Sequence, residues 1–568
     1  MSVTKDPMTL GIDQNRTHRL RAPQENRQAV VDPTWDKVSG LIQKNLSLRK
    51  LPEYDFQGRA LSAIIRQARR ELLDAARRWT AEYRNVDPLP ADPMDLIFLA
   101  GHQPQMFHPG VLFKNFALGH LAKKHQATAI NLIVDSDAIS LTSLRVPGGS
   151  ADKPYFSSVA FDRPDPRIPY EERRIEDRGL FDTFSDRVRE QIAPLIPNPL
   201  IEKYWPIVIG QSQHNDQLGA CLARARHILE AQWGLTTLEI PQSLVCTLES
   251  FHWLVAHLAA QLPRFLAVHN DVVRQYRRMY HIRNASHPVP DLAVEGEWLE
   301  APFWIWSRDH PRRKHLFIKH GRSELVLTDR QDINLNLPIT EDGDAARAVD
   351  RLVELEQRGV KIRSRALITT LWARLVLGDL FLHGIGGGNY DRITDRIIER
   401  FFNRSPPAFM ILSATLHLPI PKTSPLPLGE GQGEGSPASK RDVGPQEDLA
   451  AIDQKLRELT YHPERFLDGV FDGSSDIPNE VQSLVDQKRQ WIETPQTIQN
   501  ARTRCHAIRY VNESLQPWVD QQRQRLLQQR VQVAEQLQTK QILSWREYGF
   551  CLYPEEMLLN FMESLLPR

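Results

Sequence analysis

One segment constrains the fold more than any other part of the chain: residues 96–135 hold two short apolar runs separated by a polar loop and a helical stretch. The runs, Leu96–Ala100 and Ala129–Val134, have the length of buried strands, and Val111–His125 between them has helical apolar spacing. Strand, loop, helix and strand in this order form a βαβ unit, which requires parallel strands and a right-handed crossover. The segment therefore predicts an α/β fold with a parallel sheet.

Three further segments extend this prediction. Phe56–Tyr83 has the apolar spacing of a helix that packs on a core. The apolar run Ile207–Ile209 comes before a polar loop, and Leu380–Leu382 comes before the glycine-rich segment that starts at His383. We expect both runs to be strands of the same sheet, each followed by a helix.

Composition divides the rest of the chain. Residues 1–35 are polar, which predicts disorder, and 36–420 would form the core. Residues 301–329 alternate aromatic and polar stretches, which indicates a small antiparallel β-rich appendage. Residues 421–446 are rich in proline, glycine and serine and predict a flexible linker. Heptad-like spacing then predicts a helical, coiled-coil domain over 447–545, with a long helix from Val511 to Ser544, before 546–568 returns to the core.

Charge and cysteine usage exclude several classes of protein. The 71 basic and 70 acidic side chains leave a net charge of +1, which favours neither nucleic acid nor a membrane surface as a partner. No apolar stretch reaches the roughly 18 residues of a membrane span, so we expect a cytoplasmic protein. The four cysteines are far apart and predict neither a zinc site nor a disulfide framework.

The loop after the first predicted strand is the first candidate site. Ligands of parallel sheets bind beyond the carboxyl ends of the strands. Gly101–Gly110 places four side chains with hydrogen-bonding capacity there: His102, Gln103, Gln105 and His108. They suit recognition of a small polar ligand. The alternative is a turn whose side chains satisfy only backbone groups.

The second candidate site is the carboxylate pair Asp135 and Asp137, which follows the second predicted strand. Such a pair can hold an ammonium group, a sugar hydroxyl or a divalent metal, or can transfer a proton. Acidic residues are also common at strand ends, so a structural or solvated role is the alternative.

The third candidate site is the glycine-rich segment from His383 to Asp391, before an expected helix from Ile393. Glycines ahead of a helix expose backbone N–H groups that can bind a carboxylate or a phosphate. The alternative is a tight turn that needs positive φ. The predicted anion-binding residues are Gly384, Gly386, Gly387 and Gly388, and the predicted substrate-binding neighbours are His383, Asn389 and Tyr390.

Several known motifs are absent from the sequence. The glycine spacing matches neither the dinucleotide-binding nor the P-loop pattern, so neither NAD nor P-loop ATP is predicted as a cofactor and the cofactor stays unknown. No serine-hydrolase elbow or zincin helix occurs, and no metal site is predicted.

At the three loops the chain resembles the bacillithiol synthase family. The family's Gly-Gln-Gln-x-x-x-Phe-x-Gly-Pro loop is similar to Gly101–Gly110, with His102 in place of the first glutamine. Its acidic Glu-Asp-His-Asp motif is similar to Val134–Asp137, and its Gly-Gly-Pro-Gly-Glu motif to Gly384–Gly388, with Asn389 where glutamate is expected. The resemblance covers most of the chain from about Tyr54.

The resemblance implies a Rossmann-like core, a coiled-coil domain that supports a homodimer, and a ligase-like enzyme that adds cysteine to an amino-sugar conjugate. In this hypothesis His102 and Gln103 orient the acceptor, and Asp135 or Asp137 holds or deprotonates the attacking amine. Two alternatives stay open. One is a nucleotidyl- or glycosyl-transfer enzyme that uses both aspartates with a metal, and the other is a noncatalytic metabolite-binding or scaffold protein.

Overall fold

The computed structural model describes residues 20–50, 52–86, 92, 94–165, 167–420, 445–467, 470 and 477–567. The chain forms two compact units. The core unit comprises residues 1–148, 156–419 and 545–568, and the helical unit comprises 149–155 and 420–544. The C-terminal residues from Trp545 thus belong to the same unit as the sheet, and Tyr553 donates a hydrogen bond to the Leu416 carbonyl at 2.7 Å.

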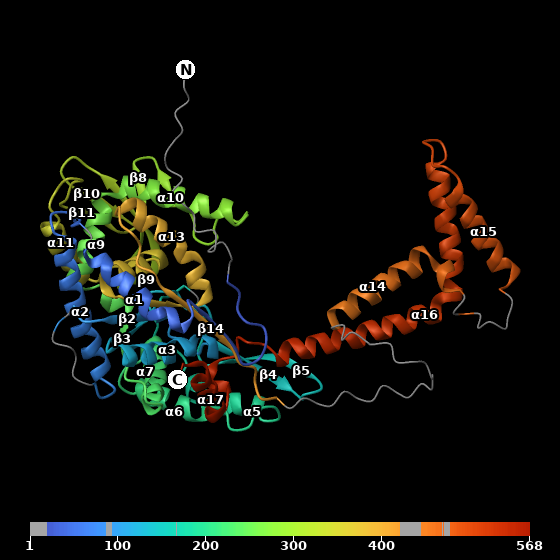
Figure 1. The fold of residues 1–568 in the computed structure, drawn as a ribbon, viewed down its shortest axis with the longest axis horizontal. Helices are drawn as coiled ribbons and strands as arrows, with labels where there is room; N and C mark the ends of the chain where they lie inside the picture. Colours follow the sequence, from blue (N-terminus) through green and yellow to red (C-terminus); the bar gives the residue numbers. More distant parts are fainter. Residues whose placement is uncertain are drawn as a thin grey trace, which may run out of the picture. The chain divides into compact units, whose positions relative to one another are not determined.

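A six-stranded sheet lies at the centre of the core unit (Figure 1). Its order is β1 (Gln28–Asp32), β14 (Met410–Thr415), β13 (Leu380–His383), β2 (Ile97–His102), β3 (Thr128–Ile133) and β6 (Leu238–Pro241). β1 is antiparallel to β14, and the other neighbours are parallel. The chain leaves β2 toward β3 and β6 and returns to β13 on the other side of β2. The point where the strand order reverses therefore lies between β2 and β13, where ligands of such sheets bind.

The predicted βαβ unit is confirmed as β2, α3 (Pro109–His125) and β3. Its strands are buried on both faces, as parallel strands usually are. On one face, Ile97 and Leu99 share a hydrophobic cluster with α2 (Leu61–Ala81). On the other face, the Phe98 ring lies 6.0 Å from His125 of α3. The α/β class of the fold is therefore confirmed.

A second sheet is antiparallel, in the order β11, β10, β9, β8 and β12, with β7 beside β8. Its strands are β7 (Val294–Glu295), β8 (Trp298–Ser307), β9 (His310–His320), β10 (Leu325–Thr328), β11 (Asn334–Leu337) and β12 (Val360–Ser364). It extends beyond the predicted 301–329. The prediction of an appendage was wrong, because Phe303 and Ile305 are in one hydrophobic cluster with Leu99 and Ile130 of the first sheet.

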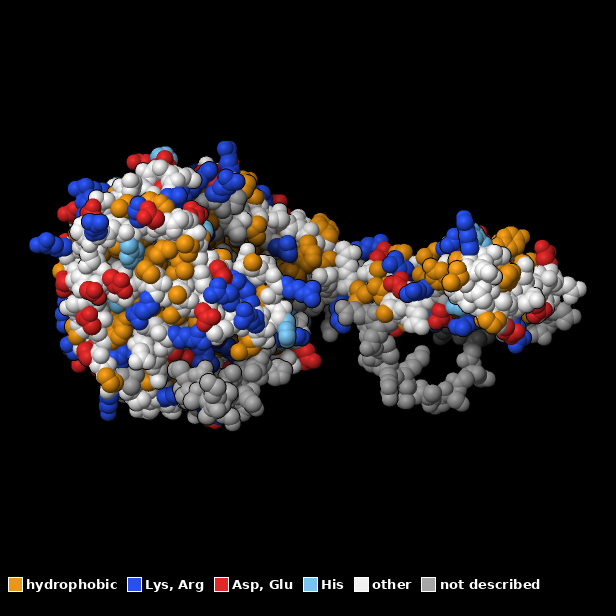
Figure 2. Space-filling view, turned by 90° about the horizontal axis from the view of Figure 1, so that it is seen from above, with side chains coloured by type: hydrophobic (Ala, Val, Ile, Leu, Met, Phe, Trp, Pro, Cys, Tyr) orange, Lys and Arg blue, Asp and Glu red, His pale blue; other side chains and the backbone are white. Residues whose placement is uncertain are grey.

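Helices connect these strands within the core unit. Besides α2 and α3 they are, in chain order, α1 (Val38–Ser47), α4 (Arg178–Asp182), α5 (Phe184–Ile192), α6 (Ile201–Ser212), α7 (Leu218–Gln232), α8 (Gln242–Val245), α9 (Glu249–Ala260), α10 (Leu262–Met279), α11 (Ala346–Gln357), α12 (Ala366–Trp372), α13 (Ile385–Phe401) and α17 (Glu555–Leu565). Strands β4 (Ser143–Gly149) and β5 (Pro154–Ala160) form a separate pair. On the visible face of the core unit, acidic and basic side chains are interspersed (Figure 2).

Two more predictions of local structure were wrong. Ile207–Ile209 is not a strand but part of α6, where Ile201, Trp205 and Val208 are buried at helical spacing. Residues 28–32 are not disordered, because they form β1 and pair along β14. Residues 1–19 of the predicted N-terminal disorder lie outside the described residues.

The helical unit contains α14 (Pro445–Tyr461), α15 (Asn479–Glu493) and α16 (Ala501–Leu543). Leu459, Val481 and Leu515 are among the residues of its own small hydrophobic core. α16 begins before the predicted Val511, and α14 begins inside the predicted linker, of which residues 421–444 lie outside the described part. Among the described residues, no helix has the length and apolar character needed to cross a membrane.

Candidate functional site

A cavity of about 710 Å³ opens at the carboxyl ends of β2 and β13, where the strand order reverses. We call it the main cavity. It brings together residues from all three predicted loops. The predicted site residues that line it are His102, Gln103, Gln105, His108, Asp137, His383, Gly384, Gly387 and Tyr390.

Four predicted residues do not line the main cavity. Asp135 lines a different cavity. Gly386 is exposed, whereas Gly388 packs against Ile411, and Asn389 donates its amide hydrogen to the Leu20 carbonyl at 3.1 Å. The last two residues therefore support the fold around α13 rather than contact a ligand in this cavity.

His102 ends β2 and is 7% exposed. Its pKa lies well below the ordinary value, because burial and then the charges of Arg226 and Lys114 disfavour the imidazolium. Nδ1 of the neutral ring lies 3.2 Å from the Gln103 carbonyl oxygen. Because a carbonyl oxygen can only accept a hydrogen bond, the ring hydrogen is on Nδ1. His102 is thus a neutral wall of the cavity at pH 7.

His108 has a structural task in addition to lining the cavity. It caps the N-terminus of α3, and its Nδ1 accepts a hydrogen bond from the Gly110 amide at 3.0 Å. Burial lowers its pKa to about 3. The neutral ring therefore carries its hydrogen on Nε2, which lies 3.3 Å from the Glu547 carboxylate.

Asp137 is held at the mouth of the main cavity by two neighbours. Gln103 donates to Asp137 Oδ2 at 3.0 Å, and Arg313 pairs with Oδ1 at 2.9 Å. The predicted loops after β2 and β3 therefore contact each other directly. A carboxylate with a fixed orientation at this position can accept a hydrogen bond from a polar ligand.

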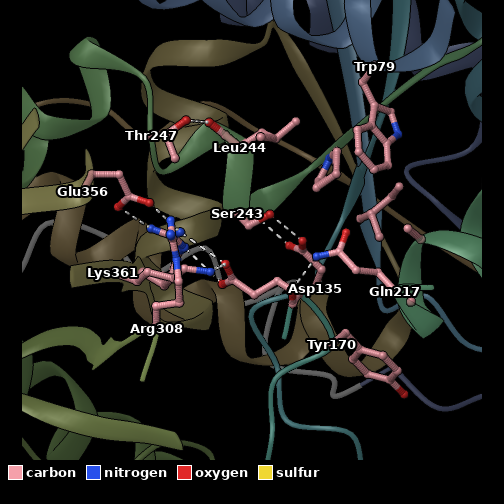
Figure 3. Close-up of a pocket in the computed structure, with 16 residues that line it drawn as sticks. Trp79, Asp135, Tyr170, Gln217, Ser243, Leu244, Thr247, Arg308, Glu356 and Lys361 are labelled. Atoms are coloured by element: carbon pink, nitrogen blue, oxygen red, sulfur yellow. Dashed lines mark hydrogen bonds and ion pairs between the residues drawn. The ribbon is translucent and has the colours of Figure 1, made fainter. Parts of the chain in front are cut away.

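Asp135 lines a second cavity of about 290 Å³, which we call the side cavity, and lies beside Ser243 there (Figure 3). It accepts hydrogen bonds from the backbone amide of Ser243 at 2.9 Å and from its hydroxyl at 2.5 Å. Burial, together with the nearby charge of Glu171, raises the pKa of Asp135 to about 7. Because the two aspartates line separate cavities, they do not form the joint carboxylate pair that the sequence suggested.

The glycine-rich segment is not a loop. Gly384 precedes α13, and Gly386, Gly387 and Gly388 form its first turn. None of these glycines has positive φ, so the tight-turn interpretation was wrong as well. The Gly388 amide donates to the Gly384 carbonyl at 2.9 Å, but the amides before it in the first turn have no intrahelical partner. Because Gly384 and Gly387 line the main cavity, the helix terminus can still contact an anion there.

His383, at the end of β13, forms a buried dyad with Asp391 of α13. Its Nε2 lies 2.9 Å from Asp391 Oδ2, and Asp391 also accepts from Thr370 at 2.6 Å and from Arg374 at 2.5 Å. Arg374 and His383 hold the pKa of Asp391 below its ordinary value although burial raises it, so Asp391 is ionised and fixes the His383 hydrogen on Nε2. The Nδ1 lone pair is then available to take a proton.

The structure also identifies a residue that the sequence reasoning missed. Lys114 of α3 is 4% exposed, lines the main cavity and donates to the Gly101 carbonyl at 2.7 Å. Burial lowers its pKa to about 8, and no described carboxylate forms an ion pair with it. A buried ammonium without an anion is costly, which points to an anionic ligand. The sequence signal that could have identified this residue is a lysine among the apolar side chains of the predicted helix Val111–His125.

Outside both cavities, His227, Glu230 and Glu239 place one ligand atom each within 4.8 Å of one another. Among the described residues, these three side chains form the group that could hold a metal ion.

Comparisons with known proteins do not assign the chain to a family: no protein-family model matches the chain, and a search of curated proteins finds no significant match.

Proposed function

We propose that this protein is a bacillithiol-synthase-like enzyme with a Rossmann-like core, which joins cysteine or a related amino acid to a small amino-sugar acceptor in the main cavity. The observation that carries the proposal is the convergence of three separate segments, which hold the family-like motifs, on one cavity of about 710 Å³. A cavity of this size suits two small polar substrates.

The residues of the cavity fit the chemistry of amide formation. The acceptor amine must lose a proton as its nitrogen attacks the carboxyl carbon, and a carboxyl oxygen must depart. His383 can accept that proton on Nδ1, while Asp391 keeps the ring oriented. Gln103 and Asp137 orient the acceptor through their polar groups.

The anionic groups of the substrates require positive partners. Lys114 and the amides at the start of α13 supply them, because both line the same cavity.

One of the two alternatives loses support from the geometry. A metal-dependent nucleotidyl or glycosyl transfer through Asp135 and Asp137 needs both carboxylates at one ion, yet they line separate cavities. A noncatalytic binding protein is distinguished by experiment. By the same resemblance we propose a cytoplasmic homodimer formed through a coiled coil of the helical unit.

Incubation of the purified protein with cysteine and glucosaminyl malate, with and without a nucleoside triphosphate, tests the proposal by mass spectrometry of the products. We expect a conjugate whose mass equals the two substrates minus water, and none with His383→Gln. Cells that lack the protein should accumulate the amine acceptor and lose the corresponding thiol. Unchanged thiol and amine pools together with no conjugate in vitro would overturn the proposal.

A further inference from the structure

A group of polar side chains is completely buried between the sheet and the helices α3 and α7. Asn115, Asn131, Glu230 and Glu239 are each 0% exposed, and Arg226 is 2% exposed. Asn115 lies on α3, Arg226 and Glu230 on α7, Asn131 on β3 and Glu239 on β6. Residues Asn131 and Glu239 are register partners in neighbouring strands, so their side chains emerge on the same face of the sheet. We call these five residues the buried polar cluster.

The two glutamates of the buried polar cluster contact a single guanidinium. Arg226 donates to Glu230 Oε1 at 2.7 Å and also to Glu239 Oε1. Asn115 donates a further hydrogen bond to Glu230 Oε1 at 2.6 Å. Two carboxylates therefore share one guanidinium in a site without solvent, and burial raises the pKa of Glu239 to about 7, so either a proton or a bound cation balances the second carboxylate. A buried charge of this kind is paired or coordinated in most proteins.

Hydrogen-bond acceptors in the cluster exceed the donors. Glu230 Oε2, Glu239 Oε2, Asn115 Oδ1 and Asn131 Oδ1 are buried and have no hydrogen-bond partner among the described residues. Of the side-chain amide donors in the cluster, the Asn131 nitrogen also lacks a partner. Such a surplus of oxygen acceptors points to something that the cluster binds.

His227 does not belong to this ligand set although it lies close to the two glutamates. Its Nδ1 is 2.8 Å from the Tyr83 hydroxyl, and its Nε2 is 3.0 Å from the Thr237 carbonyl. The carbonyl only accepts, so Nε2 donates to it and Nδ1 accepts from Tyr83. Both nitrogens are used, and the ligand atoms that remain are all oxygens.

We propose that the buried polar cluster binds one monovalent cation, K⁺ or Na⁺, through the free oxygens of Glu230, Glu239, Asn115 and Asn131. Oxygen ligands select hard cations over the softer transition metals. A single positive charge replaces the proton that Glu239 would otherwise hold, whereas a divalent ion would leave an excess of positive charge beside Arg226 and the nearby Arg84. The site is separate from the proposed chemistry, because none of its ligands lines the main cavity.

Thermal unfolding of the full chain in KCl, NaCl, MgCl₂ and choline chloride at one ionic strength tests this proposal. We expect a saturable rise in Tm of at least about 3 °C in K⁺ or Na⁺ over choline. Glu239→Gln should abolish the difference, whereas Glu71→Gln, a partly buried glutamate of α2 outside the cluster, should keep it. Equal Tm values in all monovalent salts, or a rise with Mg²⁺ alone, would overturn the proposal.

A second measurement stays decisive even if Glu239→Gln does not fold. Crystals of the unaltered protein grown with Tl⁺, which substitutes for K⁺, should show an anomalous peak among Glu230, Glu239 and Asn131. Ordinary water density there without an anomalous peak would mean that solvent alone fills the cluster. Because both tests use stability and diffraction, they succeed or fail independently of the proposed enzyme activity.

Discussion

His383 and Asp391 are joined by a hydrogen bond of 2.9 Å that links the last residue of a central strand to the first turns of the following helix. Asp391 is completely buried and ionised, so it holds the imidazole in one tautomer. This pair is the arrangement in the main cavity that is best suited to move a proton.

Replacing His383 by glutamine should abolish most of the turnover. Glutamine can still donate to Asp391 but cannot take up a proton, so kcat should fall by about 100-fold or more while Tm changes little. His125→Gln, on α3 outside the main cavity, is the matched control and should leave kcat unchanged. Equal activity of the two variants would remove His383 from the chemistry.

Three adjacent glycines of α13 should respond differently to alanine. A Cβ at Gly387 would lie 2.9 Å from His383 Nδ1, so Gly387→Ala should displace the imidazole and lower kcat at nearly unchanged Tm. A Cβ at Gly386 meets nothing within 4 Å, so that variant should keep its activity. At Gly388 the Cβ would lie 2.4 Å from Ile411, which should cost about 1–3 kcal/mol in the free energy of unfolding. Activity assays and thermal melts of the three variants check this order.

Removing the charge of Lys114 should weaken anion binding without weakening the fold. The ammonium is buried without an ion-pair partner among the described residues, so Lys114→Met should leave Tm equal or higher. Binding of inorganic phosphate, measured by calorimetry, should fall by about tenfold or more. Lys123→Met, on the exposed face of the same helix, serves as the control. Unchanged phosphate affinity in Lys114→Met would show that the anion binds elsewhere.

Asp135 should make stability depend on pH in a defined direction. Its pKa of about 7 in the folded state exceeds the ordinary value of 3.8, so between these two values the folded protein binds more protons than the unfolded chain. Stability therefore falls as pH rises through this window, by at most about 1.4 kcal/mol per pH unit. Asp135→Asn should lose this contribution, and its stability relative to the unaltered protein should grow from pH 4.5 to 7.5. A constant difference in urea melts would contradict the assignment.

The helical unit should mediate dimer formation. Tyr510, Leu527 and Val531 of α16 are exposed apolar side chains, and hydrophobic side chains are visible on this unit in Figure 2. Sedimentation should report twice the chain mass of 65.3 kDa. Introducing glutamate at Leu527 and Val531 together should give monomers whose core unit melts as before. A monomeric unaltered protein at micromolar concentration would exclude this interface.

The candidate site was predictable where it depends on the ends of strands. Gln103, Asp137 and His383 each follow an apolar run that is a parallel strand, and parallel strands bring their carboxyl ends to one edge. The direction of a side chain after the strand was not predictable in this way. Asp135 and Asp137 are two residues apart and enter different cavities, because Ser243 binds one and Gln103 and Arg313 bind the other.

Lys114 and Asp391 are two site residues whose roles the sequence pattern could not predict. Both lie on helices whose apolar spacing is clear in the sequence, but their roles depend on groups of neighbouring elements that the fold brings into contact, such as Gly101 for Lys114 and Arg374 for Asp391. Burial of a charge becomes informative only when its partners are known.

By itself the sequence determined the βαβ unit from Leu96 to Val134, because hydrophobic periodicity and strand length are local properties of the chain. The tertiary structure alone decided that Ile207–Ile209 is helical, that residues 294–364 build a second sheet on the common core, and which loops share the main cavity. These outcomes depend on burial and pairing between residues hundreds of positions apart, and such contacts leave no periodic signal in a single sequence.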